Sequence, residues 1–155
     1  MSYKLNEDAV KGLNHLLTRN KDAANGFVEV ANNITYPKLT KWLIDWAKVH
    51  EQNSSILQGF IEKSNAEADP STSLLGELHH AWIDIKAQLT NDDTVGLLDE
   101  CLTGQEKAIK DYDDIIKTVA IPVEIKGKIR TQRDLLNESI KDLRFMKNSM
   151  QTVEQ

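Results

Sequence analysis

Carboxylates and histidines are the residues of this chain that could do chemistry, and the chemistry they suggest is a pair of metal ions inside a helical bundle. Such a centre takes one Glu from each of two helices and a Glu-x-x-His from each of the other two. The ligands must be anionic, because uncharged groups do not offset the charge of two cations in a dry interior. The carboxylates available in helix-forming segments are Glu29, Glu51, Glu106, Asp134 and Glu138.

The helices that must position these carboxylates follow from apolar residues spaced three and four apart, which gather on one face of a helix. This spacing predicts long helices over about 7–33, 37–64, 93–119 and 122–150, and a shorter one over about 73–90. Asn6 is the expected N-cap of the first helix, and Pro37 suits the first turn of the second.

Neutral residues, and not the carboxylates, occupy the predicted inward faces near the middle of the four long helices. None of these helices contains a Glu-x-x-His. Turning Glu51 and Glu106 inward would expose large apolar side chains, at about 1.5–3 kcal/mol each. The sequence therefore predicts no metal site, no catalytic residue and no cofactor. The predicted polar core layer consists of Asn20, His50, Asn53, Gln105 and Gln132, with Ser139 at the same depth.

The expected role of this polar layer is structural, because buried amides fix helix register at some cost in stability. His50 is expected to bond to Gln105 or Tyr112. Two alternatives stay open: a metal ligand at the edge of the inward face, and a small mid-bundle pocket for an unknown ligand. Cys101 has no cysteine partner and is expected to be a buried, inert thiol.

The connections predict an all-α four-helix bundle built from two antiparallel helical hairpins. Only a few residues join the helices within each hairpin, whereas the link between the hairpins is long enough to return along the whole bundle. That link contains the short extra helix as a crossover. The sequence leaves open whether the helices run up-down-down-up or up-down-up-down.

The length and composition of the chain predict one domain over residues 1–155. Its apolar content of 40% is ordinary. Its net charge of −5 makes nucleic acid and anionic membrane surfaces poor partners. No apolar run reaches the length of a membrane span, and the first residues form no signal core. A single cysteine suits a reducing compartment, so a cytoplasmic protein is expected.

Three segments resemble a bacterial ferritin-like family of unknown function. Residues 97–106, LLDECLTGQE, with Tyr112 are similar to its pattern LL-x-E-C-x-x-G-E…Y, although Gln105 stands where that pattern places Glu. Residues 73–86, SLLGELHHAWIDIK, resemble its crossover, and residues 13–17 with Gly26 and Phe27 resemble its first helix. The resemblance implies a ferritin-like bundle, often linked with stress responses, and supplies no established activity.

The function expected from these observations is a non-catalytic structural or interaction module. A homodimer is expected, with the apolar face near Leu39 and Trp42 as one possible interface. The alternative is a di-metal, iron-handling oxidoreductase of the ferritin or rubrerythrin kind. Whether the chain is an enzyme therefore stays open, with the balance of residues favouring a non-catalytic role.

Overall fold

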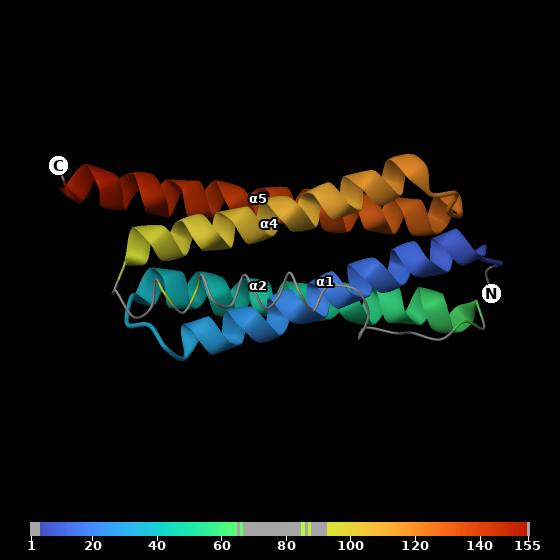
Figure 1. Ribbon diagram of the computed structural model, residues 1–155, viewed down its shortest axis with the longest axis horizontal. Coiled ribbons are helices and arrows are strands. Elements are labelled where there is room, and N and C mark those ends of the chain that lie inside the picture. The colour runs from blue at the N-terminus through green and yellow to red at the C-terminus, as the bar shows by residue number, and fades with distance from the viewer. Residues whose placement is uncertain (1–3, 65, 67–84, 86, 88–92, 155) are drawn as a thin grey trace.

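Four long helices form the described part of the chain in a computed structural model, which describes residues 4–64, 66, 85, 87 and 93–154 (Figure 1). They are α1 (Glu7–Ala31), α2 (Pro37–Lys63), α4 (Thr94–Thr118) and α5 (Val123–Glu154). The all-α prediction is confirmed, with α1 ending slightly earlier and α5 continuing slightly further than predicted. The predicted crossover helix over 73–90 lies outside the described residues except at Ile85 and Ala87.

Local chemistry explains where the helices begin. The Asn6 side chain accepts a 2.7 Å hydrogen bond from the backbone N–H of Ala9, which satisfies one of the donors left free at the start of α1. Asp93 caps α4 in the same way through a 2.9 Å bond from Gly96 N–H. Pro37 opens α2, where its missing N–H costs nothing.

The helices pair as two antiparallel hairpins, α1 with α2 and α4 with α5, as predicted (Figure 1). Helix α1 also lies beside α4, and α2 beside α5. Figure 1 shows α2 and α4 running in the same direction, so each helix is antiparallel to both of its neighbours. The order is therefore up-down-down-up, and the chain between Lys63 and Thr94 joins opposite ends of the bundle.

The core consists of two apolar clusters, with the polar side chains of mid-bundle between them. One cluster gathers near the α4–α5 turn, around Leu13, Leu57, Ile116 and Ile129. The other gathers near the α1–α2 turn, around Leu39, Trp42, Leu98 and Leu143, and Ile85 packs against it. Any polar group between these clusters must find its hydrogen-bond partners inside the protein.

Three expectations about helix faces are wrong. The apolar spacing of α2 predicts Ile56 at the margin of the inward face that carries Leu43 and Leu57, but Ile56 is 43% exposed. On α4 the apolar spacing predicts an inward stripe through Leu98 and Ile116, but Leu97 and Ala108 beside it are buried as well, because α4 packs against both α1 and α5. Leu39 and Trp42, suggested for a dimer interface, are at most 5% exposed and belong to the chain's own core.

Candidate functional site

A buried layer of neutral polar side chains crosses the bundle at mid-height. The residues predicted for it are at most 3% exposed, and all four helices contribute: Asn20, His50, Asn53, Gln105 and Gln132. Ser139 of α5 and Tyr112 of α4 are also fully buried and complete the layer. The structure connects all seven by hydrogen bonds, so we refer to them as the polar layer.

Asn20 is the hub of the layer. Its Nδ2 donates to the Leu16 carbonyl at 2.8 Å and to the Tyr112 hydroxyl at 2.8 Å. Its Oδ1 lies 2.7 Å from His50 Nδ1 and accepts a 3.3 Å bond from Asn53 Nδ2. One side chain of α1 therefore contacts residues of α2 and α4.

Tyr112 carries the network onward to α5. Its hydroxyl accepts from Asn20 and donates to Gln132 Oε1 at 2.6 Å, and Gln132 Nε2 donates to the Asn53 carbonyl at 3.4 Å. Burial raises the pKa of Tyr112 above its ordinary range, so the hydroxyl stays protonated and able to donate. Tyr112 was one of two predicted partners of His50, but it bonds to Asn20 and Gln132 instead.

His50 and Gln105 form the other half of the layer. His50 Nε2 lies 3.1 Å from Gln105 Oε1, and Gln105 Nε2 donates to Ser139 Oγ at 2.9 Å. The Phe27 ring also packs against the imidazole in a T-shaped arrangement, with centroids 5.4 Å apart. Burial lowers the pKa of His50 to about 4, against an opposing effect of the Gln105 hydrogen bond, so the ring is neutral at pH 7.

The hydrogen bonds of the polar layer tie the two hairpins together. His50 to Gln105, Asn20 to Tyr112 and Gln132 to the Asn53 carbonyl each join α1–α2 to α4–α5. The Trp42 indole N–H adds a bond of 3.2 Å to the Ser139 carbonyl. Among the described residues, no buried side-chain nitrogen or oxygen lacks a partner.

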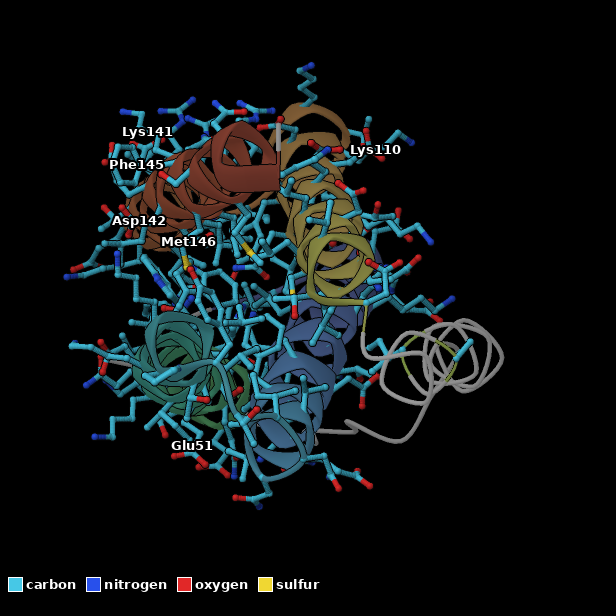
Figure 2. The ribbon with its side chains drawn as sticks, turned by 90° about the vertical axis from the view of Figure 1, so that its left-hand side faces the viewer. Glu51, Lys110, Lys141, Asp142, Phe145 and Met146 are labelled. Atoms are coloured by element: carbon cyan, nitrogen blue, oxygen red, sulfur yellow. The ribbon has the colours of Figure 1, made fainter. Side chains whose placement is uncertain are left out.

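The five candidate carboxylates lie on the outside of the bundle. The structure places Glu29, Glu51, Glu106, Asp134 and Glu138 at exposed positions. Figure 2 shows Glu51 on α2 away from the bundle axis. Glu106 Oε1 lies 3.4 Å from Arg144 Nη2, and Glu138 Oε1 lies 2.9 Å from Lys141 Nζ.

These positions do not fit a bridged pair of metal ions inside the bundle. A divalent pair needs several converging anionic ligands. Within the described ranges, no group of three or more His, Cys, Asp or Glu residues is placed to hold an ion. The sequence also contains one Glu-x-x-His, Glu77 to His80, between α2 and α4 and outside the described residues.

Two further side chains of reactive types, Cys101 and His15, contribute to the packing of the helices. Cys101 is buried, and its burial, with the charge of Glu100, raises the pKa of the thiol to about 12. His15 is half-buried and places Nε2 3.1 Å from Asp111 of α4, which also accepts from Arg19 at 2.7 Å. Sequence reasoning missed this α1–α4 contact, because its partners lie far apart in the chain.

The fold and the layer define an all-α four-helix bundle with a neutral, hydrogen-bonded centre. The chain belongs to the family described as Domain of unknown function (DUF2383), whose model matches residues 8–118. That match runs from α1 to the end of α4 and includes every layer residue except those of α5. The comparisons with curated proteins and with solved structures gave no match. None of the described helices is long and apolar enough to cross a membrane.

Proposed function

We propose that this protein is a non-catalytic helical bundle that acts through its surface as a structural or interaction module. The observation that carries this proposal is the polar layer, whose neutral side chains bond to one another and to the backbone. A satisfied interior holds the helices in register and offers no reactive group to a substrate. Chemistry at the centre would need charged or unpaired groups that the described layer lacks.

The architecture supports a ferritin-like relationship. Two antiparallel hairpins joined by one long crossover is the connectivity of ferritin-like bundles, and the chain has this connectivity in its described helices. The resemblance of residues 97–106 and 73–86 to a bacterial ferritin-like family points the same way. We accordingly propose a role in a stress response, in the cytoplasm, where the lone Cys101 would remain reduced.

The partner that the surface suits best is a second copy of the chain, bound through α5. Helix α5 carries three of the exposed large apolar side chains among the described residues, Val123, Leu135 and Phe145, and Phe145 is 71% exposed. Figure 2 shows Phe145 on the outside of α5, near Lys141 and Asp142. A patch with a positive and a negative side chain around an aromatic ring can face a second copy of itself so that opposite charges meet, as a twofold interface requires.

Light scattering across a concentration series tests this interface. The wild type is expected to have the mass of a dimer, and Phe145→Ser that of a monomer. Ile56→Ser, which removes an exposed apolar side chain of α2, is the matched control and should leave the dimer intact. A wild type that stays monomeric at the highest concentration would remove the homodimer from the proposal.

A further inference from the structure

Both ring nitrogens of His50 face amide oxygens. Nδ1 lies 2.7 Å from Asn20 Oδ1, and Nε2 lies 3.1 Å from Gln105 Oε1. A neutral imidazole has one N–H and one lone pair, whereas the imidazolium ion has two N–H groups. The two contacts are therefore both hydrogen bonds only when the ring is protonated. When the ring is neutral, the nitrogen that carries no proton points its lone pair at an amide oxygen, and that contact is repulsive.

The orientation of Asn20 decides which nitrogen of the neutral ring holds the proton. Asn20 Nδ2 donates to the carbonyl of Leu16, and a carbonyl can only accept. Turning the Asn20 amide over would therefore lose this bond and set two oxygens against each other. Oδ1 must face His50, so the proton of the neutral ring sits on Nδ1 and the lone pair of Nε2 faces Gln105.

Gln105 is not fixed in the same way. Its other partner is the Ser139 hydroxyl, which can donate as well as accept. Ser139 Oγ now accepts from Gln105 Nε2 and donates to the Leu136 carbonyl at 2.6 Å. If the Gln105 amide turns over, Ser139 can donate to Gln105 Oε1, while Gln105 Nε2 donates to His50 Nε2. Every donor then meets an acceptor around a neutral ring.

We propose that Gln105 and Ser139 form a two-position switch whose setting follows the proton on His50. With a neutral ring, Gln105 Nε2 donates to His50 Nε2 and Ser139 donates to Gln105 Oε1. With a protonated ring, His50 Nε2 donates to Gln105 Oε1 and the amide takes the orientation present in the structure. The Asn20, Tyr112 and Gln132 half of the layer keeps its bonds in both positions.

The side chains that face His50 do not compete for this proton. They are Asn20 and Phe27 of α1 and Gln105 of α4, and Gln105 leads on to Ser139 of α5. None of them is charged, and Tyr112, the titratable neighbour of Asn20, stays protonated. Because His50 belongs to one hairpin and Gln105 and Ser139 to the other, the proton resets hydrogen bonds across the interface of the hairpins.

NMR of the uniformly ¹⁵N-labelled full chain at pH 7 tests the neutral position without any substitution. The expected result is a His50 ring protonated on Nδ1, together with a scalar coupling across the hydrogen bond between Gln105 Nε2 and His50 Nε2. His50→Gln assigns the ring signals, because they disappear in that variant. A ring protonated on Nε2, or no nitrogen–nitrogen coupling at pH 7, would overturn the proposal.

Acidification of the same sample tests the second position. As the His50 signals shift to those of a doubly protonated ring, the coupling should vanish while the amide signals of the folded bundle persist. A coupling that survives protonation would overturn the switch. A bundle that unfolds before the His50 signals shift would overturn it too, since the second position would then not exist in the folded protein.

Discussion

Asn20 of α1 and Tyr112 of α4 are joined by a 2.8 Å hydrogen bond although 92 residues separate them in the chain. Tyr112 passes the network on to Gln132 of α5 through a 2.6 Å bond. Both bonds are buried, so each partner depends on the other for its hydrogen bond. The tyrosine hydroxyl therefore stabilises the contact between the two hairpins.

Tyr112→Phe should lower the free energy of unfolding by about 1–3 kcal/mol, because it leaves the buried Gln132 Oε1 without its donor. Urea unfolding monitored by circular dichroism measures this loss. Tyr36→Phe, which removes a hydroxyl from a half-buried tyrosine outside the layer, is the control and should change stability little. Equal stability of Tyr112→Phe and wild type would show that the hydroxyl does not hold the hairpins together.

The stability of the bundle should fall as the pH is lowered from about 6.5 to about 4. His50 has an ordinary pKa of 6.5 when unfolded and a pKa of about 4 when buried, so the unfolded chain binds the proton first. Protonation of His50 then costs the folded state up to about 3 kcal/mol across this window, and this contribution grows no further below it.

The His50 contribution is isolated by comparing wild type with His50→Gln in urea unfolding at several pH values. The carboxylates and the other histidines titrate in both proteins, so only the difference between the two curves reports His50. That difference should change by about 3 kcal/mol in favour of the variant on acidification. Parallel pH curves would contradict a buried neutral His50.

Gln105→Glu should raise the pKa of His50 above its wild-type value of about 4. The new carboxylate would face Nε2, where the Gln105 oxygen lies at 3.1 Å, and a negative charge favours the protonated ring. NMR titration of the His50 ring measures the change, with Glu106→Gln, a loss of charge at the exposed neighbouring position, as the control. A His50 pKa that is the same in Gln105→Glu and wild type would place position 105 away from the ring.

Cys101 should resist thiol reagents in the native protein at pH 8. Burial holds its pKa at about 12, and only the thiolate reacts at a useful rate. A chromogenic disulfide reagent should label the chain slowly in buffer and completely, to one thiol per chain, in denaturing urea. Rapid labelling in buffer would show that the second apolar cluster opens readily around Cys101.

The bounds of the long helices and the depth of their polar residues could be predicted from the sequence, because both depend on local patterns. Asn6 and Pro37 mark helix starts through groups within a few residues of them. Asn20 and Gln132 fall on their predicted faces because each replaces an apolar residue in a regular repeat. Leu97 and Ala108 of α4 are buried although they lie beside the predicted stripe, since the buried face of a helix with two neighbours is wider than one stripe.

The partners within the layer could not be predicted, because periodicity gives depth along a helix and not direction across the bundle. Tyr112 bonds to Asn20 and Gln132 and not to His50, a choice that the packing of α4 against α1 and α5 decides. The direction in which α4 runs depends on the end of the bundle at which the link between α2 and α4 ends. The exposure of Phe145 likewise breaks the expectation that large aromatic residues lie in the core.

Elemental analysis of iron tests the neutral layer most directly, using protein purified without chelators, loaded aerobically with Fe(II) and passed through gel filtration. Neutral amides at the centre and carboxylates on the outside predict only trace iron in the eluted protein. About two iron ions per chain would contradict this account, because a bridged pair needs converging carboxylates. Loss of that iron in Glu77→Ala/His80→Ala would then trace it to the Glu-x-x-His of the crossover segment.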